Sequence, residues 1–104
     1  HAMADLDAEK EAAARRSLDF VGDGMVVGLG TGDTASRAIR MLAQKVRQGL
    51  RVRGIPTSER TRRLAMELGI PFEPPDAIRL LQTGNVSWID LGLAGEMLRR
   101  DEAA

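Results

Sequence analysis

The sequence predicts a small three-layer α/β domain, in which a mainly parallel sheet of about three strands is flanked by helices. The apolar run of residues 25–29 leads through alternating glycines straight into a helical pattern, as a buried strand does before a helix. Residues 50–55 and 86–91 form two further strand-like runs, each separated from the previous one by a helical pattern. A chain of 104 residues has room for one hydrophobic core.

The composition excludes several classes of function. The 15 basic and 15 acidic residues are interspersed and give a net charge of zero, so the chain lacks the basic surface that binds nucleic acid or a membrane. Cysteine is absent, which rules out disulfides, thiolate metal sites and a cysteine nucleophile. No apolar run reaches transmembrane length and no hydrophobic signal region opens the chain, so we expect a cytoplasmic protein.

The first three residues are interpreted separately. His1 and Ala2 precede Met3, which we expect to be the initiator methionine, so residues 1–3 look like a tag remnant and a start residue. The only histidine is therefore set aside as a base or ligand. Residues 4–104 are expected to form a single domain.

The first half of the chain predicts a helix, a strand and a second helix. Residues 4–21 have helical spacing and end at a Gly-Asp-Gly turn. Residues 25–29 are too uniformly apolar for a strand with one face in water, which indicates a buried parallel strand. Asp33 or Thr34 is expected to cap the second helix, which runs to the stop at Gln48 and Gly49.

A second strand and a third helix follow. Residues 50–55 alternate in polarity, which suggests an edge or half-exposed strand. Pro56 and the hydroxyl of Ser58 then begin a helix that ends at Gly69. Because parallel strands joined by a helix follow a right-handed crossover, both strand ends and both helix starts should meet at one sheet edge.

The last third predicts a connector over residues 70–75, a short helix over 76–81, a strand over 86–91 and a final helix over 94–102. Asp90, near the end of that strand, would reach the same edge as Thr31 and Ser58. A sheet this small leaves apolar edges, so we expect a homodimer or a higher oligomer.

The glycine turn predicts an anion site, with phosphate as the usual ligand. Free N–H groups and the positive end of the helix dipole converge there, over Gly30, Thr31, Gly32, Asp33 and Thr34. The alternative is that the glycines only permit a tight turn. A dinucleotide site is disfavoured, because the third glycine comes too early and no acid ends the second strand.

Residues 10–71 resemble the N-terminal part of ribose-5-phosphate isomerase of the A type. Three stretches carry this resemblance in the order and at the spacing of the family: 26–32 (VVGLGTG), 54–59 (GIPTSE) and 68–71 (LGIP). Lys10 lies on the preceding helix at a position that the family also matches. Two loops in order are a far more specific signal than one glycine turn.

This resemblance implies a Rossmann-like domain whose glycine loop holds the phosphate of an aldose or ketose phosphate. The matched positions around the phosphate are Lys10 on the preceding helix and Thr31, Gly32 and Thr34 in the first loop, and those in a second substrate-side loop are Thr57 and Ser58. Enzymes of this family interconvert ribose 5-phosphate and ribulose 5-phosphate through an enediolate. A carboxylate acts as the base, and neither a metal nor an organic cofactor is needed.

Position 33 departs from the family, which has serine where this chain has Asp33. An ionised carboxylate a few ångströms from a phosphate repels it. As a helix N-cap, aspartate works as well as serine. The substitution therefore favours stability over ligand binding.

The sequence after Pro71 departs further, because the acidic signature of the family is absent. Ile89 and Asp90 recover its first two letters, which makes Asp90 the candidate catalytic base; the alternative is a cap or a solvated residue. In a second alignment, residues 92–100 match a later glycine run and helix, and Arg100 takes the place of an active-site carboxylate. Either alignment loses catalytic groups.

Two hypotheses follow for the whole chain. It is either a relative of the isomerase, active or retaining only sugar-phosphate binding, or an engineered or chimeric scaffold that self-associates and has no ligand. The loss of match after Pro71 suggests a truncated, recombined or redesigned isomerase whose third unit is foreign or heavily altered.

Overall fold

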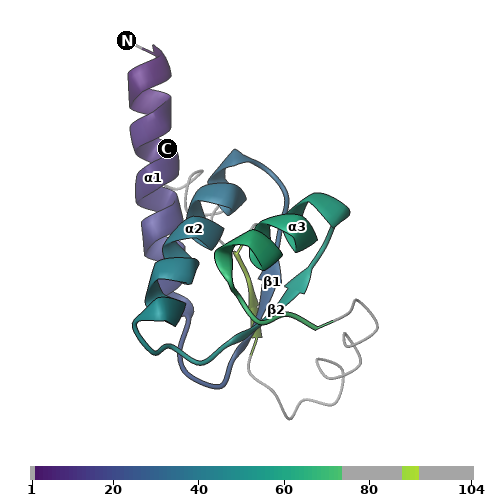
Figure 1. Cartoon of the computed structure of the whole chain (residues 1–104). Helices are drawn as coiled ribbons and strands as arrows, with labels where there is room; N and C mark the ends of the chain where they lie inside the picture. The colour runs from purple at the N-terminus through teal and green to yellow at the C-terminus, as the bar shows by residue number, and fades with distance from the viewer. Residues whose placement is uncertain (1, 74–87, 92–104) are drawn as a thin grey trace.

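The structure is a computed structural model that describes residues 2–73 and 88–91 (Figure 1). The elements, in chain order, are α1 (Ala2–Ser17), the 3-10 helix η1 (Leu18–Phe20), β1 (Val26–Leu29), α2 (Asp33–Arg47), β2 (Arg53–Pro56), α3 (Glu59–Leu68) and β3 (Trp88–Asp90). None of the described helices has the length and apolarity that crossing a bilayer demands.

The sheet is parallel and has β1 at its centre, in the order β2-β1-β3. Val27 of β1 pairs with Gly54 of β2 on one side and with Ile89 of β3 on the other. Val26 and Val27 point to opposite faces and are 1% and 0% exposed. The predicted fold class and the buried parallel strand over residues 25–29 are therefore confirmed.

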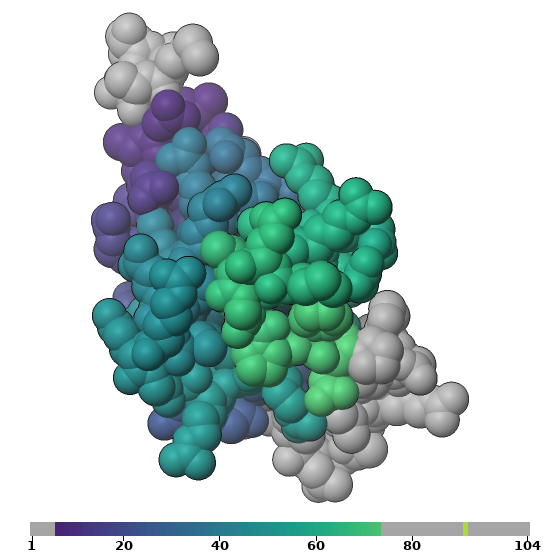
Figure 2. Space-filling view, in the orientation of Figure 1, coloured from purple at the N-terminus to yellow at the C-terminus, as the bar shows by residue number. Residues whose placement is uncertain are grey.

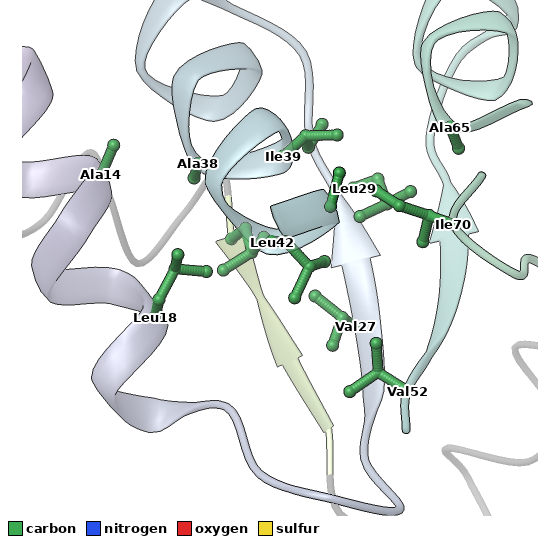
Figure 3. Close-up of a cluster of buried hydrophobic side chains, with 12 residues drawn as sticks. Ala14, Leu18, Val27, Leu29, Ala38, Ile39, Leu42, Val52, Ala65 and Ile70 are labelled. Carbon is green, nitrogen blue, oxygen red and sulfur yellow. The ribbon is translucent and has the colours of Figure 1, made fainter. Parts of the chain in front are cut away.

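Helices α2 and α3 lie over one face of the sheet, and α1 packs alongside α2 (Figure 1). Figure 3 shows the resulting core, in which side chains of β1 meet those of α2 and the end of α1. The core cluster on this face includes Ala14, Leu18, Val27, Leu29, Ala38, Ile39, Leu42 and Ala65. The side of α2 that this cluster buries is the apolar face expected from the helical pattern of its sequence.

The first helix is shorter than predicted. We expected it to continue to residue 21, but α1 ends at Ser17 and η1 follows. The Ser17 hydroxyl donates to the Ala14 carbonyl oxygen at 2.6 Å, within the buried last turn of α1. A hydroxyl bonded back to its own helix competes with the helical ladder, which fits the change to a tighter helix here.

The second strand begins three residues later than predicted, at Arg53 instead of residue 50. The Leu50 N–H donates to the Lys45 carbonyl oxygen at 3.0 Å and so completes the C-terminal cap of α2. The next N–H, of Arg51, donates to Asp23 Oδ1 at 2.8 Å. These two bonds hold residues 50 and 51 outside the β1–β2 ladder.

β2 lies at the end of the sheet order, as predicted, and the alternation expected over residues 50–55 is present from Arg51 to Gly54, which are exposed, buried, exposed and buried in turn. Within β2 itself, Arg53 is exposed and the other three residues are buried. The outer side of Gly54 is covered by the chain after α3: its N–H donates to the Pro71 carbonyl oxygen, and the Glu73 N–H donates to its carbonyl oxygen, both at 2.8 Å.

Several predicted elements lie outside the described residues. These are the helices over residues 76–81 and 94–102, and with the latter the layer expected on the second face of the sheet. The third strand is described over Trp88–Asp90, within the predicted range of 86–91.

Gly54→Ala should destabilise the protein by about 1–3 kcal/mol. A Cβ atom at Gly54 would lie 2.7 Å from Leu29 Cδ1 and 3.2 Å from Leu29 Cγ, and Leu29 is fully buried and has no room to move aside. Urea unfolding followed by circular dichroism measures the loss. Gly22→Ala is the control, because its new Cβ atom would come no closer than 4.0 Å to another heavy atom; equal stability of the two variants would contradict the clash.

Candidate anion-binding site

The turn between β1 and α2 is built around Gly32. Its backbone has φ 123° and ψ 171°, a region that side chains rarely allow. Gly32 is therefore the N-cap of α2, and the expected cap at Asp33 or Thr34 was wrong: Asp33 is already the first helical residue. Gly32, as the N-cap residue, has no side chain with which to cap α2, so the first N–H groups of the helix lack an acceptor from that position.

The second loop starts where β2 ends. Thr57 donates both its N–H (3.2 Å) and its hydroxyl (2.8 Å) to the Leu29 carbonyl oxygen at the end of β1. Ser58 is the N-cap of α3, and it shares a capping box with the Thr61 hydroxyl. Thr31 Oγ1 donates to Ser58 Oγ at 3.1 Å, which joins the two loops directly. The predicted meeting of the two loops at one sheet edge is confirmed.

Lys10 reaches this turn from α1. Its Nζ atom donates to Asp33 Oδ2 at 3.0 Å, although the two residues are 23 positions apart. The Lys10 side chain is 23% exposed and that of Asp33 is 53% exposed. The Lys10 ammonium first, and the Arg37 guanidinium second, hold the pKa of the Asp33 carboxyl below its usual value.

Arg37 is a contact that the sequence reasoning missed. It lies one turn after Asp33 on α2, with its Nε atom 3.4 Å from Asp33 Oδ1. Its other nitrogens bond Asp7 Oδ1 (3.1 Å) and Glu11 Oε1 (3.2 Å) on α1, and these carboxylates help to keep the pKa of Arg37 raised, with Asp33 as the first cause. The spacing of four between Asp33 and Arg37 is a sequence signal that could have revealed this pair.

The seam between α1 and α2 therefore carries an ion cluster, which we call the Asp33 cluster. Its members are Asp7, Lys10, Glu11, Arg15, Asp33 and Arg37. Figure 2 shows α1 and α2 in contact along this side of the molecule. With three carboxylates and three cations, the cluster is balanced in charge.

The remaining predicted site residues are placed as follows. Thr31 and Gly32 are exposed at the turn, Gly30 is buried and Thr34 is buried at 7% exposure. The backbone of Asp90 pairs with Gly28 near the carboxyl end of β1, which places Asp90 at the same sheet edge as the turn. The side chain of Asp90 lies outside the part of the chain that the structure describes.

No family model matches the chain. Over 91 residues, the chain is 53% identical to ribose-5-phosphate isomerase A of Cereibacter sphaeroides strain ATCC 17025. This match covers 86% of the chain and 33% of that protein. Its identity to the Gloeobacter violaceus enzyme of the same name is 64% over 66 residues, covering 64% of this chain and 29% of the other. The chain thus spans about a third of the length of the curated relatives it matches.

Solved structures of ribose-5-phosphate isomerases are also similar to this chain, and two of them illustrate the extent of the match. Ribose 5-phosphate isomerase A from Methanocaldococcus jannaschii has a TM-score of 0.65 and 44% identity, over 67% of this chain and 32% of that one. A D-ribose-5-phosphate isomerase in complex with phospho-erythronic acid has a TM-score of 0.67 and 33% identity, over 81% of this chain and 36% of that one.

The parallel sheet, the glycine turn and the second loop at the same edge define a small Rossmann-like α/β domain. Within that class, the chain is a homologue of ribose-5-phosphate isomerase A over about a third of that protein's length. The Cereibacter match covers more residues than 1–71 contain, so it continues past Pro71. A third unit of wholly foreign origin is therefore not needed to explain the residues that follow.

Ser58→Ala should cost about 1 kcal/mol of stability, because it removes the N-cap of α3. It also removes the acceptor of the Thr31 hydroxyl. Chemical unfolding measures the loss. Ser58→Asp keeps a capping oxygen and should recover most of it; an alanine variant as stable as the parent would show that the cap contributes nothing.

The contribution of Asp33 to stability should depend on pH. Because the pKa of Asp33 is lower in the folded chain than its usual value of about 3.9, the ionised carboxylate stabilises the fold above that pH. This stabilisation is lost as the pH falls through the lower, folded pKa. We expect the difference in unfolding free energy between the parent and Asp33→Asn to be constant between pH 7 and about 5 and to shrink below about 3.9.

Urea unfolding at a series of pH values checks this, with the same series in 1 M NaCl as the control, since salt weakens exposed ion pairs. A difference that stays unchanged down to pH 3, or that grows on acidification, would contradict the assigned ion pairs.

Proposed function

We propose that the turn from Gly30 to Thr34 binds the phosphate of an aldose or ketose phosphate, and that the chain is the phosphate-binding part of an isomerase of the ribose-5-phosphate type. One observation carries the proposal: the start of α2 has no side-chain cap and lies at the sheet edge where Lys10 and the Thr31–Ser58 hydroxyl pair also lie. Donors from three segments thereby surround one exposed turn.

Each donor suits a phosphate for a physical reason. The first N–H groups of α2 lack a side-chain acceptor, and the helix dipole adds positive potential at that point. Lys10 contributes a full positive charge, and Thr31 and Ser58 contribute hydroxyls that can turn toward an oxygen. One of the similar structures is an isomerase in complex with phospho-erythronic acid, which is consistent with a sugar phosphate as the ligand.

Isomerisation would also require a carboxylate that moves a proton between adjacent carbons, and a group that stabilises the enediolate oxygen. Asp90 is our candidate base, since its backbone lies at the sheet edge that carries the turn. The acidic signature of the family is absent from this sequence. We therefore propose that catalysis is impaired or absent while phosphate binding is retained, and that no cofactor takes part.

The alternative function is a self-associating scaffold without a ligand. The Lys10–Asp33 bond favours it, because the charge on Lys10 is already neutralised within the protein. Light scattering reports self-association, and the titration below separates a bare scaffold from a binding protein.

Titration with ribose 5-phosphate, and separately with inorganic phosphate, should shift the backbone amide resonances of Gly30, Thr31 and Gly32 with saturation at millimolar concentrations. The amide of Gly49, at the opposite end of α2, is the internal control. Lys10→Gln should weaken binding about tenfold, the effect of losing a charged hydrogen bond. If the amides of the turn show no saturable shift at tens of millimolar ligand, the proposal is wrong.

Catalysis is tested in the same samples by a coupled assay for ribulose 5-phosphate. If the chain does form the ketose, Asp90→Asn should abolish the reaction without weakening phosphate binding. Activity that survives this substitution would remove Asp90 from the role of base.

A further inference from the structure

The Lys10–Asp33 bond places a carboxylate of the protein on the cation that a bound phosphate would use. We propose that Asp33 is a residue that sets the affinity of this turn: its carboxylate holds the Lys10 ammonium, and an incoming phosphate must displace it to bind. This inference rests on the proposed function, and it concerns a residue at which this chain differs from the family it resembles.

The geometry makes Asp33 a direct competitor for Lys10. The Nζ–Oδ2 distance of 3.0 Å is that of a charge-assisted hydrogen bond between two separate helices. Asp33 is also the first residue of α2, so its negative charge already lies in the positive field of the helix start. A phosphate at the turn would therefore meet both a neutralised lysine and a partly neutralised helix end.

Arg37 makes the exchange possible without leaving a charge unpaired. Its Nε atom is 3.4 Å from Asp33 Oδ1 and its Nη2 atom is 3.5 Å from Asp33 Oδ2, so Asp33 keeps a cation when Lys10 turns away. Arg37 itself is also held by Asp7 and Glu11 on α1, whereas the described partner of Lys10 is Asp33. Arg37 is therefore anchored by several carboxylates, and Lys10 is the cation bonded to Asp33 that can change partner at the cost of one ion pair.

Charge balance gives the sign of the effect. The Asp33 cluster has three carboxylates and three cations, so a phosphate that approaches it finds Lys10 already paired with a carboxylate. Removing the Asp33 charge would leave the cluster with one excess positive charge and Lys10 without its acceptor. Phosphate affinity should then rise.

The chain supplies a matched control in Glu59. It is the first residue of α3, as Asp33 is of α2, and it pairs with arginines three and four positions later, Arg62 and Arg63. Glu59 makes no bond to Lys10 among the described residues. Glu59→Gln thus removes a helix-start carboxylate at the same sheet edge without freeing Lys10.

The test is a titration with inorganic phosphate, followed at the amides of Gly30 to Gly32. Asp33→Asn should bind about tenfold more tightly than the parent, as expected for a released charged hydrogen bond. Glu59→Gln should stay within about twofold of the parent. In a Lys10→Gln background, the gain from Asp33→Asn should fall to about twofold, because only the effect of Asp33 on the helix start then remains. Asp33→Ser is a second variant with the same expectation, should the asparagine not fold.

Unchanged affinity in both Asp33 variants would overturn the inference and leave the proposed function standing. A gain of about tenfold that persists in full in the Lys10→Gln background would also overturn it, since the effect would then come from the helix start alone. If neither the parent nor any variant binds phosphate, the proposed function fails and the inference fails with it.

Discussion

The parallel pairing of β1 with β2 is the constraint on which the rest of the structure depends. It forces α2 to cross over the sheet, which buries the apolar side of that helix on β1 and brings the starts of α2 and α3 to one edge. The close approach of Gly54 to Leu29 shows how tightly the two strands are matched. The turn at Gly32, the hydroxyl pair of Thr31 and Ser58 and the reach of Lys10 all follow from that arrangement.

Local sequence patterns were sufficient for the elements whose stability is itself local. The uniformly apolar residues 25–29 predicted a buried parallel strand, and Ser58 with the glycine after α3 predicted both ends of that helix. The start of β2 could not be predicted in this way. Leu50 completes the cap of α2 and Arg51 bonds to Asp23, a residue 28 positions earlier, so long-range bonds decide where the strand begins.

The site was predicted in its position but not in its electrostatics. The two loops and Lys10 could be inferred from the spacing of glycines, hydroxyls and a lysine, because the crossover rule brings such segments together. The sequence reasoning treated Asp33 as an uncompensated charge or a cap. The structure gives it two cationic partners, one of which comes from a helix 23 residues earlier. Pairings over that distance depend on how α1 is oriented against α2, which no local pattern determines.

Different interactions hold α1 against the rest of the protein at its two ends. Near its C-terminal end, Ala13 and Ala14 are fully buried, whereas its earlier contacts with α2 include the half-exposed ion pairs to Arg37. Apolar burial is insensitive to ionic strength, and exposed charge pairs weaken as salt is added. The rate of amide hydrogen exchange should therefore fall along α1, from its first turns to the residues near Ala14. Added salt should raise the exchange rate in the first turns, while the residues near Ala14 stay protected.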